Sequence, residues 1–262
     1  MELQDFAFIY KSKLVRPLLQ EDAHYLLPVD RYVTQNHDRA LLLLHGFASS
    51  PAAYRAMLPN LTGYDRIVCP ILPGHSESIQ SFATAKVQDW RDTARTMCTE
   101  LINTYSEVTV VGLSLGGILA LELSQMFRLH HLYLLAPALK LLYSLNLALT
   151  SARLLRAIGC VTFPNYGGDF FTDRYQELSY RRLPLNAIIE ILSLIKTFPY
   201  CLPNCPTDIF LGSHDKVVDS AYIAKQYAHQ DNITLHWLQH SAHILPLDGD
   251  IEYLTNAISR NN

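Results

Sequence analysis

Short apolar runs alternate with segments of helical periodicity from about residue 39 onward. The runs end at Gly, Pro or polar residues and predict strands over residues 39–44, 67–72, 107–111, 131–135, 208–211 and 233–238. Apolar residues at helical spacing, together with helix-capping signals, predict helices over residues 51–58, 87–105, 116–127, 219–228 and 249–259. This alternation predicts an α/β fold, with a mostly parallel sheet flanked by helices.

The alternation stops between about residues 137 and 200. Apolar residues from Leu141 to Leu155 recur at steps of three and four, which predicts an amphipathic helix, and residues 188–198 predict another. We therefore expect an inserted helical cap over the sheet. The expected domains are a core of residues 1–137 and 201–262 and a cap of residues 138–200. The alternative is that these helices belong to one larger core, because periodicity does not say what an apolar face contacts.

Composition and charge agree with a large interior. Hydrophobic residues make up 49% of the chain and charged residues 17%, below the roughly 25% of an average globular protein. The 24 acidic and 21 basic residues give a net charge of −3, without the cationic surface that a phosphate backbone requires. We do not expect nucleic acid as a partner.

No targeting or membrane-spanning segment is indicated. The first residues lack a basic start followed by an apolar stretch, and polar residues and Pro137 interrupt the longest apolar stretch, residues 132–149. The five cysteines are scattered and odd in number, and Cys201 and Cys205 lack the second pair that zinc would need. These features predict a cytoplasmic protein without a metal or another cofactor.

A serine in a glycine-rich turn is the first candidate for chemistry. Ser114 follows the β-branched run of residues 108–111 and precedes a predicted helix, with Gly112 and Gly116 two residues away on either side. A strand-to-helix turn of this kind exposes the serine hydroxyl at the carboxyl edge of the sheet, and its tight backbone needs flanking residues without side chains. The pattern therefore predicts a nucleophile at Ser114.

A serine hydroxyl needs a base within hydrogen-bond reach, and that base needs an orienting carboxylate. Asp215 and His243 each follow a predicted strand, so both should lie at the same sheet edge as Ser114. Asp208, Asp219 and His240 remain alternatives. Asp208 begins its strand, Asp219 occupies a helix-cap position, and His240 and His243 form a His-x-x-His pair without a third metal ligand.

The oxyanion of a tetrahedral intermediate needs preorganised hydrogen-bond donors. The N–H of Leu115 follows the nucleophile directly at a helix start. The loop after residues 39–44 holds Gly46, whose flexibility lets the N–H of Phe47 turn inward. We predict these two backbone groups as the oxyanion hole.

Five motifs between residues 39 and 258 together resemble the α/β-hydrolase superfamily, and within it bacterial carboxylesterases and monoacylglycerol lipases. They are His45-Gly46-Phe47, Pro73-Gly74-His75-Ser76, Gly112-Leu113-Ser114-Leu115-Gly116-Gly117, Gly212-Ser213-His214-Asp215 and Ser241-Ala242-His243. The resemblance implies the α/β-hydrolase fold with a cap, Ser114 as nucleophile, His243 as base and then acid, Asp215 as its orienting acid, and the N–H groups of Phe47 and Leu115 as the oxyanion hole. Ser76 departs from the glycine that often stands there, in a loop outside the chemistry. His45 is expected to be structural.

These features predict a carboxylesterase- or lipase-like serine hydrolase that cleaves small-molecule carboxylic esters through an acyl-enzyme on Ser114. The apolar cap, with Phe163, Phe170 and Phe171, favours an acyl chain in the substrate. Hydrolysis of an acyl thioester or an acyl-carrier-protein ester stays open as an alternative, as does a catalytically silent binding protein on the same fold. Contact of the cap with a membrane surface is a minor alternative. The sequence does not predict the acyl-chain length, the alcohol group or the oligomeric state.

Overall fold

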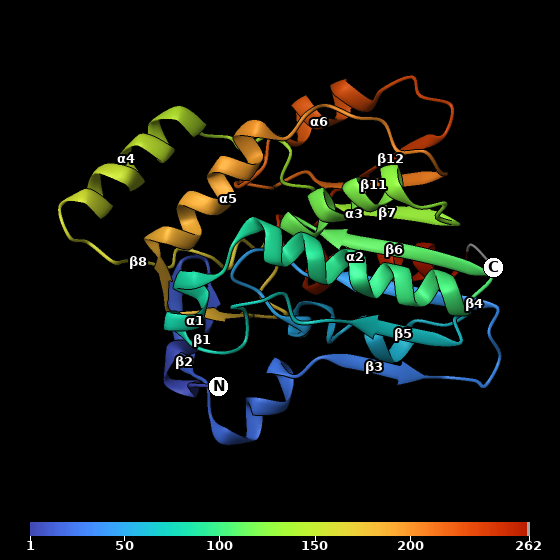
Figure 1. Ribbon diagram of the computed structural model, residues 1–262, viewed down its shortest axis with the longest axis horizontal. Coiled ribbons are helices and arrows are strands. Elements are labelled where there is room, and N and C mark those ends of the chain that lie inside the picture. Colours follow the sequence, from blue (N-terminus) through green and yellow to red (C-terminus); the bar gives the residue numbers. More distant parts are fainter. Residues whose placement is uncertain (261–262) are drawn as a thin grey trace.

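A seven-stranded sheet runs through the centre of this computed structural model, which describes residues 1–260 (Figure 1). Its strands in chain order are β3 (Val29–Tyr32), β4 (Arg39–Leu44), β5 (Arg66–Cys69), β6 (Glu107–Leu113), β7 (His131–Leu135), β11 (Thr207–Gly212) and β12 (Ile233–Leu238). Across the sheet the order is β12-β11-β7-β6-β4-β5-β3, and every pair is parallel except the edge pair of β5 and β3. The predicted α/β fold with a mostly parallel sheet is confirmed.

Helices cover the sheet on both faces (Figure 1). Outside residues 138–200 they are α1 (Ile79–Thr84), α2 (Val87–Thr104), α3 (Leu115–Met126), α6 (Ser220–Tyr227) and α7 (Ile251–Arg260). The long helix α2 buries Trp90, Ala94, Cys98 and Leu101, whose steps of three and four residues form one apolar stripe. None of the helices described over residues 1–260 is both long and apolar enough to span a membrane.

One predicted helix is wrong. In place of a helix over residues 51–58, the structure has two short 3-10 turns, Pro51–Tyr54 and Leu58–Asn60. Ser50 caps the first turn, since its side chain accepts a hydrogen bond from the N–H of Ala52 at 3.3 Å. Pro59 lacks an N–H, so it cannot donate the hydrogen bond to the Arg55 carbonyl that would continue a regular helix into the second turn.

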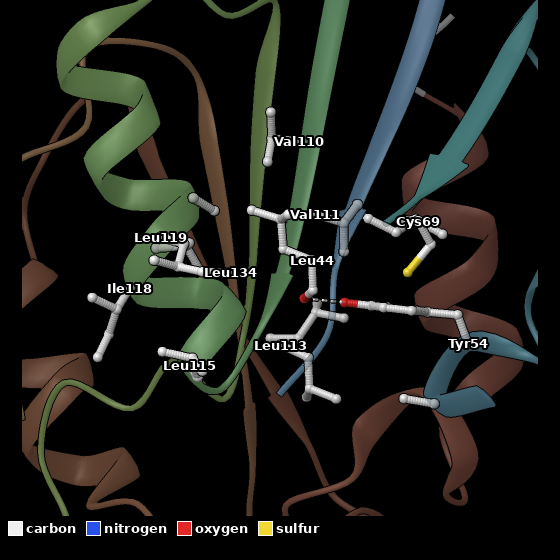
Figure 2. Close-up of a cluster of buried hydrophobic side chains, with 14 of the residues drawn as sticks. Leu44, Tyr54, Cys69, Val110, Val111, Leu113, Leu115, Ile118, Leu119 and Leu134 are labelled. Atoms are coloured by element: carbon white, nitrogen blue, oxygen red, sulfur yellow. Dashed lines mark hydrogen bonds between the residues drawn. The ribbon is translucent and has the colours of Figure 1, made fainter. Parts of the chain in front are cut away.

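The core lies on both sides of the central strands (Figure 2). Residues Leu41–Leu44 of β4 have no exposed surface, because a central parallel strand is covered on both faces. Figure 2 shows Leu115 and Ile118 of α3 on one side of the sheet and Tyr54 on the other. The buried hydroxyl of Tyr54 donates a hydrogen bond of 2.9 Å to the carbonyl of Leu44, which satisfies both polar groups.

Residues 138–200 contain strands as well as helices. The elements are α4 (Leu145–Ala157), β8 (Thr162–Pro164), β9 (Glu177–Tyr180), β10 (Arg182–Pro184) and α5 (Leu185–Thr197). The helices α4 and α5 pack together beyond the carboxyl ends of the parallel strands (Figure 1). Helix α4 begins four residues later than Leu141, because the Ser144 side chain caps it by accepting from the N–H of Leu147 at 3.4 Å. That these residues form a separate cap domain stays a prediction.

A second, three-stranded sheet joins the N-terminal segment to this region. Strand β1 (Phe6–Tyr10) pairs antiparallel with β2 (Lys13–Pro17) on one side and with β9 on the other. Strands β8 and β10, which come before and after β9 in the chain, form a separate two-stranded antiparallel sheet. The expected boundary at residue 138 therefore cuts through a sheet, because β1 belongs to the expected core and β9 to the expected cap.

Candidate active site

Ser114 lies at the junction between β6 and α3, as its sequence position predicts. Its backbone has φ of 54° and ψ of −109°, a conformation that non-glycine residues seldom adopt. A Cβ at Gly112 would lie 2.2 Å from the carbonyl oxygen of Gly116, and one at Gly116 would lie 2.0 Å from that of Leu44. The two glycines thus permit the close backbone contacts around the turn that carries the Ser114 hydroxyl.

His243 and Asp215 reach Ser114 from the loops after β12 and β11. The distance from His243 Nε2 to Ser114 Oγ is 3.0 Å, and that from His243 Nδ1 to Asp215 Oδ2 is 2.8 Å. The Asp215 side chain is fully buried, and its Oδ1 accepts hydrogen bonds from the N–H groups of Val217 at 2.7 Å and Val218 at 2.9 Å. Three side chains far apart in sequence therefore form one continuous hydrogen-bonded chain.

The charges around His243 favour its protonated form. Burial alone would lower the pKa of His243, because it disfavours the imidazolium ion. The charge and hydrogen bond of Asp215 act in the opposite direction, with smaller contributions from Asp169 and Glu177, and they raise the pKa of His243 above its ordinary 6.5. An imidazole in this setting can take a proton from Ser114 and hold it beside a carboxylate.

The alternative acids lie elsewhere. Asp208 accepts hydrogen bonds from Nε2 of His131 at 2.6 Å and from Nε2 of His236 at 2.5 Å, near the amino-terminal part of its strand. Asp219 caps α6, because its side chain accepts from the N–H of Tyr222 at 2.9 Å. Neither carboxylate contacts His243.

Neither the alternative base His240 nor His214, the neighbour of Asp215 in sequence, forms a hydrogen bond with Ser114 in the part of the chain that the structure describes. The His240 side chain is 67% exposed, and its Nδ1 lies 3.3 Å from Asp250. The ring of His214 stacks on Phe171, with 4.1 Å between centroids. Within residues 1–260, no group of three or more His, Cys, Asp or Glu side chains is arranged to hold a metal ion.

The two predicted oxyanion donors lie beside Ser114. Leu115 begins α3, and a Cβ at Gly46 would lie 3.5 Å from the Ser114 Cβ, so the loop carrying Phe47 passes next to the serine. Among the residues that the structure describes, neither Phe47 nor Leu115 has a hydrogen-bond acceptor for its backbone N–H. Both donors are free to bind an oxygen atom of another molecule.

Buried His45 holds the turn before Phe47. Its Nε2 accepts a hydrogen bond from the N–H of Leu72 at 3.1 Å, and its Nδ1 lies 3.0 Å from the Gly46 carbonyl oxygen. Burial lowers the pKa of His45 to about 4, so the ring is neutral at pH 7 and its Nδ1–H donates to that carbonyl. These two hydrogen bonds hold the backbone of the turn that precedes Phe47.

A cavity of about 630 Å³ opens at Ser114. Apolar residues of α4 and α5 supply much of its wall, among them Ala148, Ala152, Leu155, Ile188, Ile191, Leu192 and Ile195. Phe163 contributes as predicted, but Phe170 and Phe171 do not: Phe170 packs with Ile244 and Leu247, and Phe171 covers His214. Ser114 and Phe47 lie at the same cavity, so an apolar chain inside it would end near the serine.

Several known proteins are similar to this chain in sequence or in structure. The thermostable monoacylglycerol lipase of Bacillus sp. (strain H-257) is 25% identical over an alignment of 242 residues, and the match covers 88% of this chain and 93% of that protein. A solved structure described under LipS and LipT, two metagenome-derived lipolytic enzymes, is similar with a TM-score of 0.77 and 24% identity. The match covers 87% of this chain and 94% of the other. For the monoacylglycerol lipase of Paleococcus ferrophilus, the TM-score is 0.68, the identity 13% and the coverage 89% and 97%.

The family follows from a match to a family profile. Residues 41–253, from β4 into α7, match the profile of the alpha/beta hydrolase family. That span includes Ser114, Asp215 and His243 and the parallel strands that bring them to one edge of the sheet. The chain belongs to the alpha/beta hydrolase family.

Proposed function

We propose that the protein is a serine hydrolase of carboxylic esters with an apolar acyl chain. The observation that carries this proposal is the hydrogen-bonded series Ser114–His243–Asp215 at the end of an apolar cavity. A binding protein would need the cavity, but it has no physical need for an imidazole placed between a hydroxyl and a buried carboxylate. The likeness to a monoacylglycerol lipase supports the same class of substrate.

In the proposed reaction Ser114 Oγ attacks the ester carbonyl while its proton passes to His243 Nε2. The Phe47 and Leu115 N–H groups stabilise the resulting oxyanion. His243 then gives the proton to the departing alkoxide, which leaves as the alcohol, and an acyl-enzyme remains on Ser114. Water attacks that acyl group, losing its proton to His243, and the proton returns to Ser114 as the carboxylic acid is released. Asp215 keeps the Nδ1–H of His243 oriented and stabilises the imidazolium.

Covalent labelling tests the proposal directly. A fluorophosphonate forms an adduct only with an activated serine, so intact-mass measurement should show one adduct per chain, and peptide mapping should place it on Ser114. The Ser114→Ala variant should remain unlabelled. Labelling of another serine, or no labelling of the folded protein, would contradict the nucleophile and favour a silent binding protein.

A thioester would use the same three residues. Comparing kcat/KM for an acyl-CoA and for the p-nitrophenyl ester of the same acid separates the two substrates. We expect the oxygen ester to be the better substrate, because the similar protein is a lipase. A clear preference for the acyl-CoA would replace the ester with the thioester and leave the mechanism at Ser114 unchanged.

The pH dependence of activity should report His243. The free enzyme needs a neutral imidazole to accept the Ser114 proton, so kcat/KM should fall as the pH drops through the pKa of His243. Because that pKa is raised, the midpoint of the acid limb should lie above pH 6.5. Steady-state rates on a p-nitrophenyl ester measure it, with recovery of activity on return to pH 8 as the control for unfolding. A midpoint below pH 6.5 would contradict the electrostatic account.

The wall of the cavity should set acyl-chain preference. A tryptophan in place of Ala148 would fill space between α4 and α5, excluding about three methylenes of a long chain. At about 0.8 kcal/mol each, their loss lowers kcat/KM for a p-nitrophenyl laurate by about 10- to 100-fold. The acetate ester should be hydrolysed at nearly the wild-type rate.

A matched control lies one residue away on the same helix. Leu147 is 68% exposed and faces away from the cavity, so Leu147→Trp should leave both esters unaffected. Equal loss of long-chain activity in the two variants would show that the acyl chain does not occupy this cavity.

A further inference from the structure

Residues 168–172, which we name the clamp segment, run between β8 and β9 and contact both loops that carry the proposed acid and base. The segment is fixed at its start by Gly168, whose φ of 75° favours glycine. The N–H of Gly168 donates at 2.6 Å to buried Glu177 of β9, and its carbonyl accepts from the N–H of Lys11 at 2.7 Å. The clamp segment therefore has its own anchor outside the two loops.

Asp169 of this segment binds the residue that follows each proposed catalytic side chain. Its Oδ2 accepts a hydrogen bond of 2.9 Å from the N–H of Lys216, directly after Asp215. Its backbone carbonyl accepts a longer bond of 3.4 Å from the N–H of Ile244, directly after His243. One residue thus connects the two loops.

Asp248 makes the reciprocal connection from the histidine loop. This carboxylate has no exposed surface, and its Oδ2 accepts from the N–H groups of Ala242 at 2.9 Å and Phe171 at 2.7 Å. Its Oδ1 accepts from the N–H and the hydroxyl of Thr172 at 2.8 and 2.7 Å, and from the N–H of Gly249 at 3.0 Å.

A buried carboxylate is costly unless hydrogen bonds compensate for lost hydration. Breaking the hydrogen bonds to Asp248 is therefore costly, and these bonds hold the N–H groups of the histidine loop and of the clamp segment in place. Since Ala242 directly precedes His243, those donors fix the backbone before the imidazole, and the bond to Asp169 fixes the backbone after it.

We propose that Asp169 and Asp248 are positioning residues that hold the acid loop and the histidine loop against the clamp segment, so that the spacing of Asp215, His243 and Ser114 depends on them. This inference rests on the proposed function. The titratable side chains facing His243 are Asp215, Asp169 and Glu177. Asp169 thus contributes a negative charge as well as a connection.

Two substitutions separate the connection from the charge. Asp169→Ala removes both. Because a displacement of the base by about 1 Å costs about 100-fold in rate, we expect kcat for p-nitrophenyl butyrate to fall by about that factor, with KM within about threefold of the wild-type value. Asp169→Asn keeps an oxygen for the Lys216 N–H and removes the charge. It should retain kcat within about threefold and move the acid limb of kcat/KM to lower pH, because loss of a negative charge makes the imidazolium less stable.

Asp248→Asn tests the other connection. An amide offers one acceptor oxygen where the carboxylate offers two, and its NH₂ group faces N–H donors. We expect kcat to fall about tenfold or more at a similar KM, together with a lower urea midpoint. Exposed Asp173, next to the clamp segment, supplies the control: Asp173→Asn should have the wild-type kcat, KM and pH profile.

The inference is overturned if folded Asp169→Ala has the wild-type kcat and Asp169→Asn the wild-type acid limb. If Asp169→Ala does not fold, Asp248→Asn decides, because it weakens the other connection: the wild-type kcat in folded Asp248→Asn would overturn the inference. Fluorophosphonate labelling of Ser114 distinguishes failure of this inference from failure of the proposed function. If the wild type is labelled but the Asp169 variants have wild-type kinetics, only the positioning role is rejected. If the wild type is not labelled, the proposed function is rejected.

Discussion

Replacing Ser114 by alanine is expected to lower kcat for p-nitrophenyl esters by about 10⁵- to 10⁶-fold. The substitution removes the oxygen that would carry the acyl group and leaves the Cβ, so the turn between β6 and α3 keeps its shape. His243→Ala should cost about as much, because residues that act as one unit are not additive and the double variant should be no worse than either single one. Steady-state kinetics on all three variants measures this, with circular dichroism to show that each is folded.

A histidine on the same loop gives the matched control. His240 lies three residues before His243 but is exposed and bound to Asp250, so His240→Ala should retain at least half of the wild-type activity. The assignment of His243 as the base would be wrong if His240→Ala were inactive and His243→Ala active. Residual turnover by Ser114→Ala at the wild-type level would remove the acyl-enzyme from the mechanism.

The second large effect concerns stability. Gly116→Ala is expected to lower the free energy of unfolding by about 4 kcal/mol or more, because the new methyl group would lie 2.0 Å from the Leu44 carbonyl oxygen and 2.6 Å from its carbon. Leu44 cannot move aside, since β4 is paired with β5 and β6 in the middle of the sheet. Urea unfolding, followed by fluorescence, measures the loss if soluble protein is obtained.

Gly46→Ala is the control for this substitution. Its methyl group would meet the Ser114 Cβ at 3.5 Å, an ordinary van der Waals contact, so the free energy of unfolding should change by no more than about 1 kcal/mol. A Gly116→Ala protein with the wild-type urea midpoint would show that α3 and β4 approach less closely than the structure has them.

The interior strands were predictable because their position in the fold dictates their composition. The predicted strands over residues 131–135 and 233–238 coincide with β7 and β12, and residues 39–44 coincide with β4. A parallel strand covered by helices reads as a continuous apolar run, which Gly or a turn then ends. The edge strand β3 was missed because its burial alternates and it precedes the regular part of the pattern.

The small sheet of β2, β1 and β9 was beyond prediction for a different reason. Strand β2 is exposed at every residue, and β9 lies 167 residues or more from its partner β1, so neither carries a local signal of the pairing. The helical periodicity of residues 141–155 was recognised, but the start of α4 depends on the cap at Ser144.

The candidate site was partly predictable. The motifs identified Ser114, Asp215 and His243, and strand order implied that they would meet, since parallel strands end at one edge. Asp169 and Asp248 were missed. Their hydrogen bonds go to backbone N–H groups of residues that become neighbours only in the fold, and a single aspartate in a loop carries no signature of such a role.

The pairing of β1 with β9 limits how residues 138–200 could move relative to the core. Four residue pairs join the two strands, from Phe6 with Tyr180 to Ile9 with Glu177. Any outward swing of β9 must either carry the first seventeen residues with it or separate a strand pair whose side chains include the contact of Phe6 with Tyr180, at 4.3 Å between rings. The beginning of the chain is thus tied to residues 138–200 at β9, and the bridge of Leu141 with Val218 ties the segment before α4 to the loop that carries Asp215.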